Sequence, residues 1–478
     1  MSLETKLLSE QSTTGGEQLL PAWSVLAVLC GVAFTSNVII SLILPILPQH
    51  YEQIGVSQIW CGVVFSGFPV AMLVFSPLAV LAMSRFGRIP VLFLGLVVQG
   101  VTTLTFGCAD LLTGGPGACP GAALAVYTLS RFLCGAGGAC ANNAIFSVAA
   151  DRFPAALAKV MGLNEVTIGA GFTLGPLIGM VLYLRCGFST CFLVAGMTIL
   201  VFSPFTLALW QPRPAESSDA PLPTEAGGLL EVLRPGLLVP AGSLLLGTGV
   251  FGVVQPILSL YLRDAVGATP GMIGVVFAVF SLAYCAAGPL MGALADRVGA
   301  PQVCCAGGFA SGLIMALFLG PEAEIFPKGS LARLAYEMAA LVLLGISQAA
   351  TLIPSLPAMK AGVPADLPNS TDRVVAWFNM FMQLGLAVSP LVGTALSGLL
   401  GFEWTTAISG LGIAAYGAAA VVYAFSPARR AFNHELKLRS PLHLVTGVTL
   451  SPFSSPKAGR ALSLDSPRLL ALQEPPPP

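Results

Sequence analysis

Long apolar runs separated by short polar segments fill most of this chain. A helix needs about 20 mainly apolar residues to cross a bilayer. Twelve runs of about that length follow one another: residues 22–47, 58–83, 89–109, 121–149, 157–184, 187–210, 236–262, 270–295, 302–320, 331–357, 374–399 and 403–426. The pattern therefore predicts an all-α membrane protein with twelve transmembrane helices.

Composition supports the same class of protein and excludes others. Hydrophobic residues make up 55% of the 478 residues, charged residues make up only 9%, and the mean hydropathy is +0.84. An ordinary soluble protein carries charges at about 25% of its positions, so this chain is not one. The formal net charge is zero, and we expect no nucleic-acid partner because such binding needs a basic face.

A polar segment between the sixth and seventh runs divides the chain into two sets of six. Residues 211–235 are rich in Pro, Ser and acidic side chains, and such a segment cannot bury a hydrophobic core. The expected organisation has five parts: a cytoplasmic tail at 1–21, a six-helix bundle at 22–210, a cytoplasmic linker at 211–235, a second six-helix bundle at 236–426 and a disordered cytoplasmic tail at 427–478.

The two sets of six repeat each other. Three markers recur at an offset of 212 to 214 residues: Gly62–Phe65 with Gly274–Phe277, Arg85 with Arg297, and Gly175 with Ser389. Duplicated six-helix units related by an axis along the membrane normal are one architecture of transporters, which bind solute near the midplane between the units. We therefore expect two halves related by a pseudo-twofold axis.

The basic residues orient the chain, because Lys and Arg are enriched on the cytoplasmic side of membranes. With both termini in the cytoplasm, the opposite side receives only Arg185, Arg263, Lys328 and Arg333. This asymmetry predicts cytoplasmic termini.

Three ionisable side chains lie inside the predicted spans, where charge is costly and each such residue is a candidate for function. They are Arg131, Glu165 and Glu337. Glu337 lies only a few residues into its helix, so we interpret it as an interfacial carboxylate that reaches water. Burial disfavours the charged form of a carboxyl group. Glu165 is therefore our candidate proton carrier, the alternative being a hydrogen-bonded glutamate that only ties helices together.

Arg131 lies near the middle of its span and needs a partner or a water-filled cavity; we interpret it as a coupling residue. A direct ion pair with Glu165 is not expected. From the predicted helix centres the two residues lie about 14 Å apart along the membrane normal, at a rise of about 1.5 Å per residue.

Glycines recur every four residues after Glu165 and form one stripe on a helix. The stripe contains Gly171, Gly175 and Gly179, with Pro176 removing a backbone donor and favouring a kink. It predicts a site of close packing and bending in conformational change, and packing without any coupling role is the alternative.

Two short segments place a basic residue and a glycine at a tight cytoplasmic turn between helices. The first is Ser84–Arg88 and the second is Ala295–Ala300. Their candidate conformational residues are Arg85, Gly87 and Arg88 in the first turn, and Asp296, Arg297 and Gly299 in the second. We expect Asp296 to hold a neighbouring helix until the protein changes state.

Polar uncharged side chains within the spans are candidates for lining a substrate cavity. The selected residues are Asn37, Gln255, Asn143, Gln348 and Asn379. Each is equally suited to bonding one helix to another.

Together, the two turns, the glycine segment after Arg131 and the segment Gly169–Gly179 resemble signatures of the major facilitator superfamily. The GxxxGPxxG form is similar to the antiporter motif of its proton-linked drug and amine exporters. Residues 46–65, 164–183, 253–262, 353–360 and 401–410 further resemble the vesicular amine transporter family, closest to its polyamine branch.

This resemblance implies exchange of luminal protons for cytosolic cationic amines, and therefore amine uptake into an acidic vesicle. The polyamine branch carries one acid before the proline of the seventh helix and another after the proline late in the tenth. Here those positions hold Gln255 and Ala358, and Ser84 replaces the aspartate usual in the first turn.

The C-terminal tail contains Asp465, Leu469 and Leu470 at the spacing of an acidic dileucine sorting signal, which favours a vesicle or another endomembrane over the plasma membrane. We expect a monomeric secondary transporter whose partners are a small solute, protons and the bilayer. A broad-specificity exporter at the cell surface and a solute receptor without net flux are the alternatives. The sequence has no catalytic nucleophile with a base, no metal-ligand set and no phosphate loop, so we expect no enzyme and no cofactor.

Overall fold

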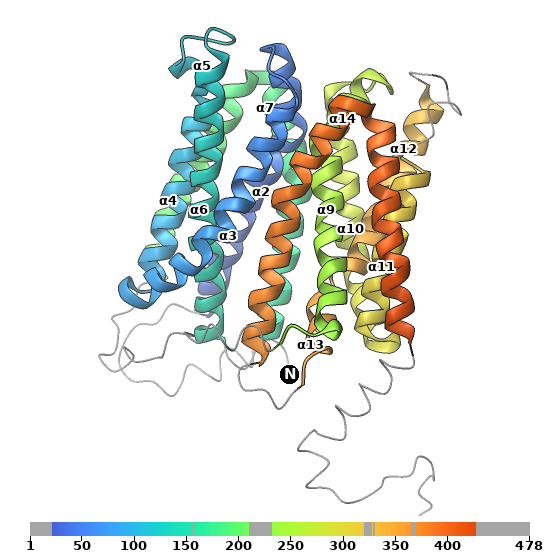
Figure 1. The fold of residues 1–478 in the computed structure, drawn as a ribbon. Coiled ribbons are helices and arrows are strands. Elements are labelled where there is room, and N and C mark those ends of the chain that lie inside the picture. The colour runs from blue at the N-terminus through green and yellow to red at the C-terminus, as the bar shows by residue number, and fades with distance from the viewer. Residues whose placement is uncertain are drawn as a thin grey trace, which may run out of the picture.

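The computed structural model describes residues 22–153, 157–209, 232–319, 327, 330–364 and 370–426. This part of the chain is helical and contains no strand (Figure 1). Ten of its helices are long and apolar enough to cross a membrane. The predicted fold class, an all-α membrane protein, is therefore confirmed.

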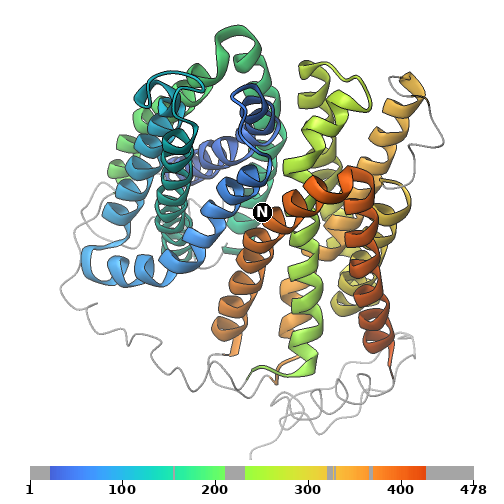
Figure 2. The ribbon, with the colours of Figure 1, turned by 45° about the horizontal axis from the view of Figure 1, so that its top comes forward.

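The helices form two groups along the chain. The first bundle comprises α2 (Ala22–Gln53), α3 (Ile59–Phe86), α4 (Arg88–Gly107), α5 (Ala109–Leu112), α6 (Pro120–Arg152), α7 (Leu157–Phe202) and the 3-10 helix η3 (Ser203–Leu209). The second bundle comprises α9 (Pro235–Asp264), α10 (Pro270–Val298), α11 (Ala300–Leu317), α12 (Leu331–Leu352), α13 (Ser355–Lys360) and α14 (Ser370–Phe425). Figure 2 shows the two bundles side by side.

The difference between ten long helices and twelve predicted spans comes from α7 and α14. Each is interrupted by one glycine with left-handed backbone angles, Gly187 at φ 80° in α7 and Gly401 at φ 80° in α14. L-residues with a Cβ avoid this region, whereas glycine adopts it readily. Each glycine reverses the chain, so each of these two helices contains two of the predicted spans.

Most predicted boundaries lie within a few residues of the helix ends, and two larger differences have a clear cause. The first span was predicted to end at residue 47, but α2 continues to Gln53, because Pro48–Tyr51 are buried within the bundle and only Glu52 and Gln53 are exposed. The tenth was predicted to run to residue 357, but α12 ends at Leu352 and α13 begins at Ser355. Proline at 354 and 357 prevents continuous helical hydrogen bonding across that segment.

The bundles repeat one packing scheme. Helix α2 packs along α7 in the first bundle, and α9 packs along α14 in the second; between the bundles, α3 contacts α14, α10 contacts α7, and α2 contacts α9. We call the end where α2 begins and α14 finishes the terminal end, and the end where α2 and α9 finish the distal end. Residues Ser41–Tyr51 of α2 and Pro256–Leu262 of α9 are all buried. The bundles are therefore closed against each other at the distal end.

Candidate transport site

Glu165 lies on α7 at the face that meets the second bundle. Gly169, one helical turn nearer the distal end, is so close to α10 that a Cβ there would meet the Cys285 sulfur. The Glu165 carboxyl interacts electrostatically with Tyr284 and Cys285 of α10. Its side chain is exposed, so Glu165 stands on the terminal side of the contact between α7 and α10.

Tyr284, which interacts with this carboxyl group, belongs to an aromatic cluster. The Tyr284 ring packs edge-on against Phe251 of α9, with ring centroids 5.9 Å apart, and Phe251 also lies 5.1 Å from Phe280. A carboxylate beside aromatic faces is suited to an organic cation, since rings attract cations through their quadrupole. Sequence reasoning missed both Tyr284 and Phe251, because aromatic residues within an apolar span carry no distinguishing pattern.

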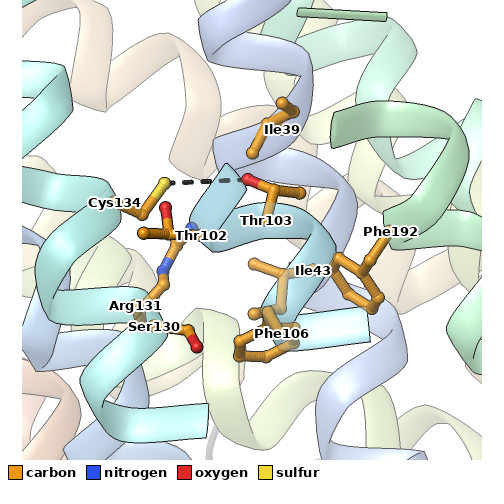
Figure 3. A pocket seen from close by; sticks show the side chains of 9 residues that line it. All are labelled: Ile39, Ile43, Thr102, Thr103, Phe106, Ser130, Arg131, Cys134 and Phe192. Atoms are coloured by element: carbon orange, nitrogen blue, oxygen red, sulfur yellow. Dashed lines mark hydrogen bonds between the residues drawn. The ribbon is translucent and has the colours of Figure 1, made fainter. Parts of the chain in front are cut away.

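Arg131 lies inside the first bundle, in a pocket lined by α2, α4, α6 and α7 (Figure 3). It lines a cavity of about 10 Å³, close to the room that one water needs, together with Ile39, Ile43, Thr102, Thr103, Phe106, Ser130, Cys134 and Phe192. The side chain is only 6% exposed, and its guanidinium stands 4.8 Å from the centre of the Phe68 ring. Its Nε has no hydrogen-bond partner among the described residues.

The two predicted coupling residues are therefore in different surroundings. Arg131 lies among α2, α4, α6 and α7 of its own bundle, whereas Glu165 faces α10 of the other bundle. No ion pair joins them within the described part of the chain, which agrees with the separation expected from the sequence.

Most of the predicted cavity-lining amides form local hydrogen bonds. The Nδ2 groups of Asn37, Asn143 and Asn379 each donate to the carbonyl four residues earlier, at 2.7, 2.8 and 3.1 Å. Each bond uses one of the two Nδ2 hydrogens, so the other N–H and the side-chain oxygen stay available for a solute. Gln255 is half-buried, whereas Gln348 is fully buried and neither of its amide atoms finds a partner among the described residues.

The glycine stripe of α7 lies against α2. A Cβ at Gly171 would stand 2.9 Å from the Phe34 carbonyl oxygen, and one at Gly179 would stand 2.8 Å from Leu42. The Ser41 hydroxyl donates to the Gly171 carbonyl at 3.1 Å across this contact. Gly175 continues the same face, so the stripe brings two backbones of one bundle close together, while Pro176 beside it lies against Gly274 of α10.

The two predicted turns are similar in backbone but differ in their side-chain contacts. Gly87 has φ 93° between α3 and α4, and Gly299 has φ 116° between α10 and α11. In the first turn Arg88 pairs with Asp151 at the end of α6, while Arg85 lies over Phe86.

In the second turn Arg297 and Asp296 are exposed. Asp296 makes no hydrogen bond or ion pair with the described residues, so the expected contact with a neighbouring helix is not seen. Ala358 is fully buried in α13, and the sorting residues Asp465, Leu469 and Leu470 lie outside the described residues.

A buried polar cluster that the sequence did not reveal lies at the distal end of the first bundle. His50 Nε2 stands 2.8 Å from Asp110 Oδ2 and 3.2 Å from the Tyr127 hydroxyl, while its ring stacks on Phe188 at 3.7 Å. All of these side chains are buried. The hydropathy pattern placed His50 after the first span and therefore in a loop. It could not pair His50 with Asp110, which is 60 positions away in the sequence.

The second bundle has a corresponding cluster, which corrects the interpretation of Glu337. Arg333 is fully buried and donates to the Tyr261 hydroxyl at 2.8 Å and to Glu403 at 3.2 Å. Glu337 lies four residues after Arg333 on the same helix face and is also fully buried. It is therefore not the carboxylate in reach of water that the sequence predicted, because its side chain is enclosed in the bundle.

Comparisons with known proteins identify relatives of this chain. The Major Facilitator Superfamily model matches residues 29–255 and again residues 241–467. The MFS-type transporter SLC18B1 of Mus musculus is 30% identical over 382 residues, covering 78% of this chain and 79% of that protein. The synaptic vesicular amine transporter of Homo sapiens is 24% identical over 371 residues, covering 76% and 66%. The crystal structure of the nucleoside transporter NupG shares the fold, with a TM-score of 0.66 at 13% identity, covering 84% of this chain and 100% of that one.

Proposed function

We propose, from the premise that this chain belongs to the major facilitator superfamily, that it exchanges protons for a small organic cation by alternating access. The cation is an amine or a polyamine, and Glu165 is the proton carrier. The chain is a membrane transporter and not an enzyme; the coupling ion and the substrate class are the parts proposed.

The placement of Glu165 supports this proposal. Of the acidic residues predicted inside the spans, Glu337 is sealed within the second bundle, whereas Glu165 is exposed at the contact between bundles. A carboxyl group at that contact experiences a different environment whenever the bundles rotate. It can therefore bind a proton in one state and release it in the other, which is the requirement for coupling.

The surroundings of Glu165 favour an organic cation as the exchanged solute. Glu165 supplies the charge, and Tyr284, which packs on Phe251, supplies an aromatic ring near it. Gln255 and Ala358 stand where the polyamine branch carries acids, so a substrate here would meet fewer carboxylates. We infer that a compact monoamine suits the site better than a long polyamine.

The compartment follows from the relatives and from the sequence. One relative is named a synaptic vesicular amine transporter, and the tail carries the dileucine pattern at Asp465, Leu469 and Leu470. We propose an acidic vesicle or another endomembrane with both termini in the cytoplasm. We also propose that Arg131 assists coupling and that a monomer is sufficient for transport.

Uptake into proteoliposomes tests the proposal. The purified full chain is reconstituted with an inside-acid pH gradient, and labelled serotonin, spermidine and a lipophilic cation are supplied outside. We expect gradient-driven accumulation of serotonin above that of spermidine. Glu165→Gln abolishes the accumulation, because an amide cannot carry the proton.

Glu165→Asp is the matched control, since it keeps a carboxyl group at the same position. It should retain gradient-driven uptake at a reduced rate. If no amine accumulates while the protein remains monodisperse, the amine assignment is wrong. If Glu165→Gln transports as well as the original chain, the proton carrier is another group.

A further inference from the structure

We propose that Glu52 and Arg263 form an ion-pair lock between the two bundles, which keeps the distal end closed and opens when solute is exchanged on that side. The lock goes beyond the proposed exchange reaction but rests on its alternating-access part. It does not depend on which solute or ion is carried.

The geometry places this pair across the interface. Glu52 lies in the last turn of α2 and Arg263 in the last turn of α9, and Arg263 Nη1 stands 2.6 Å from Glu52 Oε2. The two helices belong to different bundles. Just before the pair, both helices are buried on all sides over Ser41–Tyr51 and Pro256–Leu262. The ion pair therefore covers the outer edge of a closed contact.

The internal repeat gives the two residues equivalent positions. Each follows by two residues an aromatic ring stacked within its own bundle: His50 on Phe188 at 3.7 Å and 12°, and Tyr261 on Phe402 at 3.9 Å and 12°. The matching stacks fix the last turn of each helix to its own bundle. Breaking the ion pair consequently means moving one bundle relative to the other, and not merely bending a loose helix end.

Arg263 has a second ion-pair partner, which lowers the free-energy cost of opening the distal end. Its Nε stands 2.7 Å from Asp264 Oδ1 on the same helix. When the bundles separate, Arg263 loses Glu52 but keeps this neighbouring carboxylate. The side chains of Glu52 and Arg263 are also 46% and 34% exposed, so water replaces the lost contact. The lock therefore biases the closed state by a small factor and does not trap it.

The size of that bias follows from what exposed ion pairs contribute. Pairs of this kind change an equilibrium by roughly two- to five-fold. We expect the population open at the distal end to rise by about two- to five-fold when the pair is removed, and high ionic strength to give part of the same effect because it screens exposed charges.

A cysteine reporter measures this population without any transport assay. Ser259 lies four residues before Arg263 on α9, is fully buried, and its hydroxyl has no hydrogen-bond partner among the described residues. Ser259→Cys is introduced into the full chain after the exposed cysteines, Cys119 and Cys186, and the half-buried ones, Cys30, Cys108, Cys140 and Cys285, are changed to Ser. Its rate of labelling by a bulky, membrane-impermeant maleimide in nanodiscs reports opening of the distal end.

A double-mutant cycle tests the lock. Glu52→Gln and Arg263→Gln should each raise the labelling rate by about two- to five-fold, and the double variant should label no faster than either single variant. Asp264→Asn is the matched control, because it removes a charge beside Arg263 but leaves the contact between bundles. It should label no faster than the original chain, since the open state then loses the carboxylate that Arg263 keeps.

Three results would overturn the lock: unchanged labelling in both single variants, effects that multiply in the double variant, or an Asp264→Asn rate as high as that of Glu52→Gln. Because the readout is accessibility, a failure of amine uptake leaves this test unaffected. A failed lock likewise leaves the proton exchange at Glu165 to be judged by its own assay.

Discussion

Buried ionic residues at the distal end have partners of opposite charge within their own bundle, whereas Arg131 has none among the described residues. His50 is paired with Asp110, and Arg333 is paired with Glu403. Arg131, in contrast, is buried with no acidic partner in the described residues, and its Nε is unpaired. Burying a charge without a partner costs free energy, so Arg131 lowers the stability of the folded protein.

The pairing of His50 with Asp110 makes a prediction about stability. His50→Phe keeps an aromatic ring stacked on Phe188 but removes the hydrogen-bond donor, which leaves a buried carboxylate without its partner. Breaking a buried pair in this way costs about 3–5 kcal/mol. We expect a clearly lower apparent melting temperature in detergent, measured by loss of the monodisperse species after heating.

The control for this prediction replaces both partners. His50→Phe combined with Asp110→Leu removes the unpaired carboxylate, and replacing a buried pair by apolar residues of similar size is often neutral. The double variant should therefore regain most of the lost stability. If the double variant is less stable than His50→Phe alone, the unpaired Asp110 carboxylate is not the cause of the instability of His50→Phe.

The sequence could identify some of these residues and not others. Arg131 and Glu165 stand out because charged residues are so rare within apolar runs. The contact between His50 and Asp110 could not be predicted, since both lie in polar segments that are indistinguishable from loops in a hydropathy pattern. Their contact depends on how helix ends meet in three dimensions.

At the scale of the elements, α7 and α14 each combine a close-packing face with a glycine break. The stripe of α7 packs on α2 inside the first bundle, and Gly393 of α14 packs on Val253 of α9 in the same way. Close backbone approach of this kind replaces hydrophobic burial as the source of specificity between helices in a membrane. The stripe therefore fixes the shape of a bundle that moves as one body.

Adding a methyl group to the stripe should weaken the first bundle. A Cβ at Gly175 would stand 2.9 Å from the Val38 carbonyl oxygen and meet the Ser41 hydroxyl. Overpacking of this kind costs about 1–3 kcal/mol, so Gly175→Ala should lower the apparent melting temperature. Gly162→Ala in the same helix is the control, because no atom lies within 4 Å of its added Cβ.

Gly162→Ala should leave the melting temperature unchanged or raise it, since alanine favours a helix by up to about 1 kcal/mol over glycine. Equal losses in the two variants would show that close packing is not the reason for glycine at 175. Removing the Ser41 hydroxyl as well, with Ser41→Ala, should recover only part of the loss, because the Val38 carbonyl remains in place.

Hydropathy located the elements well but not their ends. Run length predicts a span because only a helix of about 20 residues satisfies its backbone across a bilayer. The turn Pro48–Tyr51 of α2 was missed because Gln49 and His50 are polar and yet buried at the distal end. Burial of that turn is a property of the assembled bundle, and no local pattern encodes it.

At the scale of the whole molecule, the repeated sequence markers turn out to build the contact between bundles. Gly62 of α3 lies against Pro390 of α14, and Gly274 of α10 lies against Pro176 of α7. The glycines occupy equivalent positions in the repeat, as do the two prolines. The pseudo-twofold axis thus pairs the start of each second helix with the glycine- or serine-proline segment of the opposite half.

This contact predicts a graded response to added bulk. A Cβ at Gly62 would stand 2.6 Å from the Pro390 carbonyl oxygen, which is backbone and cannot rotate away, whereas one at Gly274 would first meet the Met180 Cβ at 3.0 Å. Gly62→Val should therefore drive the bundles apart at the distal end more strongly than Gly274→Val. Overpacking by about 1 kcal/mol or more raises the population open at the distal end by about fivefold or more. This increase is measured as faster labelling of the Ser259→Cys reporter.

Gly271→Val in the first turn of α10 is the control, since its added Cβ has no neighbour within 4 Å, and it should label at the original rate. We expect labelling rates to fall in the order Gly62→Val, Gly274→Val, Gly271→Val. This order indicates a rigid contact between the bundles, because general destabilisation would not follow the Cβ distances. Slower labelling in Gly62→Val would contradict closure at this contact. Because Gly62→Val and Glu52→Gln act at separate places on one interface, combining them should multiply their effects, unlike the two members of the ion pair.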